Sequence, residues 1–134
     1  MIQALKKEQY SALVVDDEQK ICDLICLFLS ATGRFKTLVA AQNAVQAIQK
    51  LQNQTFDIVI VDHKMPGKSG IDLIGTLSKT PKNRLMKYIL ISGCLTKEDV
   101  IVAMNEGGRH ILVKPFSRTQ LLNKIGEVLK DEIL

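Results

Sequence analysis

The sequence predicts an α/β fold in which a doubly wound, five-stranded parallel sheet is covered by helices on both faces. Two observations carry this prediction: short runs rich in Val and Ile recur along the chain, and segments with helical periodicity lie between them. The runs are Ala12–Val15, Leu38–Ala41, Ile58–Val61, Tyr88–Ile91 and Ile111–Val113. Because they mostly do not alternate with polar residues, they are typical of strands buried on both faces.

The segments between the runs place apolar residues on one side of a helix. In the clearest case the apolar residues recur at i, i+3, i+4 and i+7, which gives a single stripe. The stripes are Ala44, Ala47, Ile48 and Leu51; then Val100, Ala103 and Met104; then Leu121, Leu122, Ile125, Val128 and Leu129. Thr96 with Asp99, and Ser117 with Gln120, are predicted to cap the last two helices.

Strands and helices therefore alternate along the whole chain, as they do when parallel strands are joined by helical crossovers. Right-handed crossovers leave few topologies, and the strand order 2-1-3-4-5 is the leading one. The polar segment 78–87 contains Pro81 and is too short to link two domains. We expect one domain over residues 11–134, preceded by an N-terminal extension over residues 1–10.

Composition narrows the class of protein. The 134 residues suit one domain, and aromatic residues make up only 4% with no Trp, so the core must be aliphatic. The net charge of +4 is spread along the chain without a run of five basic residues. A nucleic-acid-binding module usually clusters its positive charge, so direct binding of DNA or RNA is not expected.

Cysteine usage and hydropathy indicate the compartment. Cys22, Cys26 and Cys94 form no C-x-x-C motif, and their odd number suits neither a disulfide framework nor a structural zinc site. This pattern is typical of a reducing compartment. Residues 1–10 resemble no signal peptide, and no apolar stretch reaches the length of a membrane helix. A cytoplasmic protein without membrane contact is therefore expected.

Carboxylates follow two of the predicted strands. Asp16, Asp17 and Glu18 come directly after the first strand, and Asp62 follows the third. With strand order 2-1-3, these two strand ends are neighbours at the edge where doubly wound folds place their sites. Crowded carboxylates repel one another, and a hard divalent cation offsets that repulsion. The sequence therefore predicts a site for Mg²⁺ (or Mn²⁺), which prefers oxygen ligands.

The remaining strand ends add a hydroxyl and a cation. Ser92 ends the fourth strand, and Lys114 ends the fifth, where Pro115 follows it. A nucleophilic carboxylate, a metal, a hydroxyl and a lysine are the groups that phosphoryl transfer uses, because charge on the phosphoryl oxygens must be stabilised. Asp62 is the best candidate nucleophile, because it alone ends the central apolar run.

These motifs resemble the receiver domain of two-component response regulators, with its flavodoxin-like fold, over roughly residues 11–130. Each motif follows one predicted strand, and the four occur in order. They are Val14-Val15-Asp16-Asp17-Glu18; Val61-Asp62-His63-Lys64-Met65-Pro66-Gly67 with Gly70; Ile91-Ser92-Gly93; and Val113-Lys114-Pro115-Phe116.

The resemblance implies a role for each residue. Asp62 would accept the phosphoryl group, and Ser92 and Lys114 would bind it. Mg²⁺ would be held by Asp17 directly, by Asp16 mainly through water, by Asp62 and by the backbone carbonyl of Lys64. The donor would be a sensor histidine kinase or a histidine phosphotransfer protein. Such a domain catalyses only its own phosphorylation and dephosphorylation, and homodimers are common in the family.

The sequence departs from the family pattern at several positions. Many receivers carry Tyr or Phe three residues before the lysine, where this chain has Ile111, so the usual coupling through a turning ring cannot operate in the same way. Ser69 stands where many relatives have Asp or Asn, and is expected to cap a helix instead. Lys64 and Cys94 occupy variable positions that flank the path of attacking water, so they are candidates for setting the phosphoryl lifetime.

The first predicted helix is unusually apolar over residues 21–29. Ile21, Leu24, Ile25 and Phe28 suffice for a core stripe, which would leave Cys22, Cys26 and Leu27 outside. A helix that is apolar all round is usually covered on all sides. Ile21, Cys22, Cys26 and Leu27 are therefore candidates for a partner or self-association surface. The alternative is that small thiols are tolerated at half-buried positions, since single exposed apolar residues need no explanation.

The sequence supports three possible functions to different degrees. The first is a phosphorylatable receiver that switches protein contacts. The second is an interaction module that keeps the fold without depending on phosphate, which Ile111 favours and the complete set of site residues opposes. The third is an aspartyl-phosphate hydrolase resembling the haloacid dehalogenases, which carry an Asp-x-Asp motif. Asp16-Asp17-Glu18 does not match that motif, so this function is not expected.

Overall fold

The computed structural model describes residues 9–107 and 110–133, and contains one five-stranded parallel sheet in those residues. The strand order is β2-β1-β3-β4-β5, as predicted. The strands are β1 (Tyr10–Val15), β2 (Phe35–Ala41), β3 (Ile58–Asp62), β4 (Lys87–Ser92) and β5 (Ile111–Val113). The first eight residues of the predicted extension 1–10 lie outside the described residues, so the boundary at residue 11 stays a prediction.

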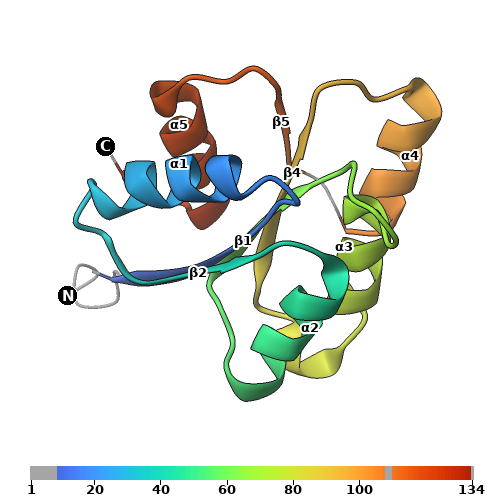
Figure 1. Cartoon of the computed structure of the whole chain (residues 1–134), viewed down its shortest axis with the longest axis horizontal. Coiled ribbons are helices and arrows are strands. Elements are labelled where there is room, and N and C mark those ends of the chain that lie inside the picture. The colour runs from blue at the N-terminus through green and yellow to red at the C-terminus, as the bar shows by residue number, and fades with distance from the viewer. Residues whose placement is uncertain (1–8, 108–109, 134) are drawn as a thin grey trace.

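Helices cover both faces of the sheet. Helices α1 (Gln19–Ser30) and α5 (Arg118–Leu129) lie on one face, and α2 (Ala44–Asn53), α3 (Gly70–Ser78) and α4 (Lys97–Asn105) lie on the other (Figure 1). A short 3₁₀ helix, η2 (Pro81–Asn83), lies in the segment predicted to be a loop. Among the described residues, no helix is long and apolar enough to cross a membrane.

The central strands are buried on both sides, which is why their sequences do not alternate. On β1, Leu13 and Val15 pack toward α2 and α3, while Ala12 and Val14 pack toward α1 and α5. All five residues of β3 are buried. β1 pairs with β3 in parallel, with Val15 opposite Val61, so the carboxyl ends of the two strands meet at one edge.

Side-chain caps begin four of the helices. The Ser69 hydroxyl accepts a hydrogen bond from the amide of Asp72, as predicted for this position. Thr96 with Asp99, and Ser117 with Gln120, form the two predicted capping boxes. Asn43, which the sequence analysis did not single out, caps α2. These bonds satisfy amides that a helix start otherwise leaves unpaired.

Helix α4 differs from the predicted stripe. Ala103 is its one buried residue, whereas Met104 is 54% exposed, so the prediction that Met104 faces the core is wrong. The reason is that Val100 to Met104 are five apolar residues in succession, which define no single face. The sheet can cover only one line of them, and it leaves Ile101, Val102 and Met104 on the surface.

The chain turns back after α5 and is tied to the start of the sheet. Asp131, whose side chain is 2% exposed, accepts hydrogen bonds from the Tyr10 hydroxyl and the Arg34 guanidinium. Arg34 also donates to the carbonyl of Glu132 and lies over the Tyr10 ring. Ile133 is buried in the core beside α5. A buried ion pair therefore holds the C-terminal turn against β1 and β2.

Replacing Arg34 with Gln is expected to lower the free energy of unfolding by about 2 kcal/mol, because the Asp131 carboxylate would stay buried without its cation. Urea unfolding followed by circular dichroism measures this. The matched control is Lys124→Gln, which breaks a pair with Glu127, a carboxylate that is 62% exposed rather than buried, and should cost at most about 0.5 kcal/mol. Equal losses in the two variants would contradict a structural role for the buried pair.

Candidate functional site

Three predicted carboxylates meet at the carboxyl end of the sheet. Asp16 and Asp17 follow β1, Asp62 ends β3, and one oxygen from each lies within 4.8 Å of the others. Asp16 and Asp62 are buried, while Asp17 is exposed. The arrangement therefore brings one oxygen from each carboxylate together, two from buried residues and one from an exposed residue.

Lys114 brings a positive charge to the same point. Its Nζ lies 3.0 Å from Asp62 Oδ1 and 3.7 Å from Asp16 Oδ2. Burial by itself would lower the pKa of Lys114, but the hydrogen bond to Asp62 and the attraction of Asp62 and Asp16 outweigh burial and raise that pKa. The lysine therefore stays protonated near neutral pH and can stabilise negative charge on or beside Asp62.

Asp16 is held in an environment that disfavours its charged form. Its pKa is raised to about 6, mainly by burial and also by the neighbouring charge of Asp62, although the backbone amide of Glu18 opposes the shift by donating to Oδ1. Its Oδ2 is buried and has no hydrogen-bond partner among the described residues. An orphaned carboxylate oxygen beside two further carboxylates suits a hard divalent cation, so these residues could hold Mg²⁺.

Ser92 ends β4 and is 4% exposed. Its Oγ accepts a hydrogen bond of 3.2 Å from the Cys94 amide, which leaves its own hydroxyl proton out of that bond. Ile111, at the position where an aromatic ring was expected from the family pattern, is half-buried against the core beneath α2, α3 and α4. The side chains of Lys64 and Cys94 are both exposed.

Gly70 lets α3 begin directly against the phosphoacceptor candidate. A Cβ at this position would lie 2.4 Å from the backbone oxygen of Asp62 and 2.9 Å from His63 Cα. The Gly70 amide donates to the His63 carbonyl at 2.9 Å, which fixes this approach. From the sequence Gly70 is visible only as part of a motif, because contact between a strand end and a helix start does not follow from spacing.

Gly70→Ala is expected to cost about 2 kcal/mol or more of unfolding free energy, because the clash is with backbone and cannot be relieved by a rotamer change. Thermal unfolding would report the loss. Gly93→Ala is the control, since its Cβ would meet nothing closer than Lys114 Cβ at 3.8 Å. A Gly70 variant as stable as the Gly93 variant would show that α3 can shift away freely.

One predicted surface residue is buried. Cys22 is 0% exposed and its Sγ lies 3.5 Å from the carbonyl of Asp16, so it cannot belong to a partner surface. Leu24, expected in the core, is instead 41% exposed. The helix is rotated so that Cys22, Ile25 and Leu29 face the sheet, because its first turn lies close to the strand ends and admits only a small side chain. Burial raises the pKa of the Cys22 thiol to about 11.

The arrangement of these groups is matched by a known family. Residues 12–126 match the family model described as the response regulator receiver domain. The chain belongs to this family. Receiver domains are signalling modules of two-component systems, and the five-stranded order 2-1-3-4-5 found here is their flavodoxin-like fold.

Individual relatives support the assignment. This receiver domain is 31% identical over 123 residues to the uncharacterized transcriptional regulatory protein YesN of Bacillus subtilis, covering 91% of this chain and 33% of YesN. It is 29% identical over 118 residues to the phosphate regulon transcriptional regulatory protein PhoB of Escherichia coli, covering 88% of this chain and 51% of PhoB. The chain thus spans between a third and about half of the length of these two relatives.

A solved structure of a short chemotaxis protein has the same fold. The chemotaxis protein CheY4 of Vibrio cholerae superposes with a TM-score of 0.83 at 23% identity, covering 90% of this chain and 98% of CheY4. The receiver fold therefore accounts for nearly the whole of a short protein as well as for part of longer ones.

Proposed function

We propose that this receiver domain accepts a phosphoryl group on Asp62, in the presence of Mg²⁺, from a phosphohistidine of a sensor histidine kinase or a histidine phosphotransfer protein. The observation that carries the proposal is the contact of Asp62 with Lys114, made beside the oxygens of Asp16 and Asp17. A carboxylate held between a lysine and two further carboxylates suits transfer of an anionic group only when a cation completes the site.

The residues of the site have different roles in the transfer of the phosphoryl group. An Asp62 carboxylate oxygen attacks phosphorus, the new O–P bond forms, and the P–N bond of the donor breaks with its electron pair returning to the imidazole. The Lys114 ammonium and the Ser92 hydroxyl bind phosphoryl oxygens as their negative charge builds. Asp16, Asp17, Asp62 and the Lys64 carbonyl would hold Mg²⁺, which supplies further positive charge at those oxygens.

Lys64 and Cys94 are proposed to set how long the phosphoryl group persists. Both side chains are exposed, and both follow closely on a site residue, Asp62 in one case and Ser92 in the other. Groups at these positions would meet water approaching the phosphorus from outside.

The partner surface is proposed to lie on α1 and to include Leu24. Leu27 is 64% exposed and Leu24 41% exposed, while Ile21 and Cys26 are half-buried beside them. Leu24 and Leu27 are three residues apart on the helix, so they form one apolar patch. Asp17, whose side chain is exposed, lies just before the start of this helix. A kinase or phosphotransfer protein that covers this patch would bring its histidine to the carboxylates.

Output is proposed to work through changed protein contacts, homodimer contacts included. Ile101, Val102 and Met104 on α4 and Val113 on β5 are exposed apolar residues, on the two elements that flank Ser92 and Lys114 in the sequence. Phosphorylation would draw Ser92 toward Asp62 and alter the loop that leads into α4. Ile111 would make room in this rearrangement by aliphatic repacking rather than by turning a ring.

Intact-protein mass after incubation with acetyl phosphate tests the proposal. With Mg²⁺ present, we expect the mass to increase by one phosphoryl group, and with a chelator in its place we expect no increase. A folded protein that gains no mass from acetyl phosphate, and none from candidate phosphohistidine donors, would instead support an interaction module independent of phosphate. Ile111 is the feature that favours that second function.

A further inference from the structure

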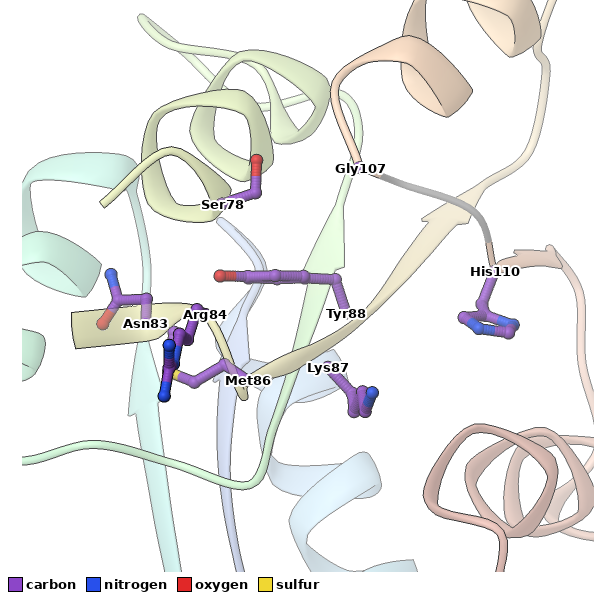
Figure 2. Close-up of a pocket in the computed structure, with 8 residues that line it drawn as sticks. All are labelled: Ser78, Asn83, Arg84, Met86, Lys87, Tyr88, Gly107 and His110. Atoms are coloured by element: carbon purple, nitrogen blue, oxygen red, sulfur yellow. The ribbon is translucent and has the colours of Figure 1, made fainter. Parts of the chain in front are cut away.

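A second site candidate lies at the opposite end of the sheet from the carboxylates. A pocket of about 270 Å³ opens where β4 begins, between the end of α3 and the turn after η2 (Figure 2). Its lining includes Ser78, Asn83, Arg84, Met86, Lys87 and Tyr88. Lys87 and Tyr88 start β4 whereas Ser92 ends it, so the pocket is separate from the site of phosphorylation.

Two buried polar atoms in the pocket wall have no hydrogen-bond partner among the described residues. They are the Tyr88 hydroxyl and Asn83 Oδ1, in residues that are 6% and 2% exposed. The side-chain nitrogen of Asn83 donates to the Leu77 carbonyl at 3.3 Å, so the side-chain oxygen of Asn83 is the atom without a partner. In Figure 2 the Tyr88 ring lies between Ser78 and Met86, with its hydroxyl directed toward α3 and η2 and away from His110. Unpaired buried polar groups are rare, and each calls for an explanation.

The pair offers a donor and an acceptor. Burial raises the pKa of Tyr88 to about 12, so the phenol stays protonated and can donate. Asn83 Oδ1 can only accept. Met86, which is 6% exposed, lines the same pocket, and its unbranched side chain adapts readily to a ligand.

The rim of the pocket is positively charged. Arg84 and Lys87 are both exposed, and the described residues that line the pocket include no carboxylate. Residues 79–87 hold Lys79, Lys82, Arg84 and Lys87 but no acidic residue. Lys79 is paired with Glu106, whereas the pocket lining offers Arg84 and Lys87 no acidic partner. This distribution favours an anionic ligand, and Arg is well suited to the oxygens of a phosphate.

We propose that this pocket binds a small phosphomonoester, whose phosphate pairs with Arg84 and Lys87 and whose body exchanges hydrogen bonds with Tyr88 and Asn83. The volume suits a molecule of the size of a sugar phosphate or a nucleoside monophosphate. The ligand carries its charge at one end and a hydroxyl or ring nitrogen at the other. Such a ligand would bind whether or not Asp62 is phosphorylated, because the two sites lie at opposite ends of β4.

Titration of the ¹⁵N-labelled protein with AMP and with glucose 6-phosphate, followed by amide NMR, tests the proposal. We expect amides within residues 78–88 to shift and saturate for at least one probe, with a Kd of about 1 mM or lower, while those of Ser92 and Lys114 stay in place. The double variant Arg84→Gln, Lys87→Gln should bind about tenfold more weakly or worse. Tyr88→Phe, which removes only the hydroxyl, should weaken binding by about threefold to tenfold.

The matched control removes two exposed lysines elsewhere, Lys20→Gln with Lys36→Gln, and should leave the affinity unchanged within about twofold. Failure of both probes to give saturable shifts at residues 78–88 would overturn the proposal. Equal affinity for inorganic phosphate would also overturn it, because it would indicate an adventitious ion only. A Tyr88→Phe variant that binds as tightly as the parent would likewise rule out recognition by the buried hydroxyl.

Discussion

Asp62→Asn is expected to abolish phosphorylation by acetyl phosphate and by phosphohistidine donors. The amide is a far weaker nucleophile than the carboxylate, and the Lys114 ammonium lies closer to Asp62, at 3.0 Å, than to Asp16, at 3.7 Å, so the phosphoryl group is expected on Asp62. The variant should also be at least as stable as the parent, since it removes one of two buried like charges. Incorporation of phosphoryl groups, measured by intact mass at several times, reports the result.

The matched control for this loss is Asp72→Asn, which neutralises an exposed carboxylate in the first turn of α3. It should be phosphorylated at a rate within about twofold of the parent, because the exposed charge is screened from the site. An Asp62→Asn protein that still gains one phosphoryl group at the parent rate would contradict the assignment of the acceptor. The stability comparison keeps a folding defect from being mistaken for lost chemistry.

Lys114→Gln is expected to slow phosphorylation by about 10²-fold, because one fixed positive donor to the developing phosphoryl charge is lost. Its Nζ already lies 3.0 Å from Asp62 Oδ1, so the ammonium is in place before the donor arrives. Gln is one methylene shorter than Lys; it keeps a hydrogen-bond donor but carries no charge. The rate of mass increase at saturating Mg²⁺ is the measurement.

The control for Lys114 is Lys50→Gln on the exposed side of α2, which changes the net charge equally and should leave the rate unchanged. If Lys114→Gln were phosphorylated as fast as this control, the lysine would serve only to neutralise Asp16 and Asp62 at rest. The free energy of unfolding would then fall while the rate held.

Much of the fold could be predicted because the apolar runs of β1 and β3 indicate buried strands and the apolar stripes of α2 and α5 indicate helices with one buried side. The run Ile58–Val61 is apolar throughout because helices cover both of its faces, and the structure places every residue of β3 in the core. Crossover handedness predicts the strand order, and the strand order predicts that Asp16, Asp17 and Asp62 lie at one edge, where the structure has them.

Helices α1 and α4 were harder to predict, because their apolar residues outnumber the positions that a core can cover. In α1 the choice between Cys22 and Leu24 depends on how closely the helix start approaches the ends of β1 and β2, which periodicity does not report. In α4 the apolar residues follow one another directly, so the sequence does not indicate which side of the helix faces the core. The pocket beside Tyr88 could not be predicted either. Its lining residues come from separate segments, and only the structure shows that two of their polar atoms have no hydrogen-bond partner among the described residues.

Location of the phosphoryl group within the chain is the most direct test of the central claim. The phosphorylated protein would be reduced with borohydride, which converts an aspartyl phosphate to homoserine, and its peptides sequenced by tandem mass spectrometry. We predict homoserine at position 62 alone, formed only when Mg²⁺ and a phosphoryl donor were both present. Homoserine at Asp16 or Asp17, or an unmodified peptide from protein that had gained phosphoryl mass, would contradict the claim that Asp62 is the acceptor.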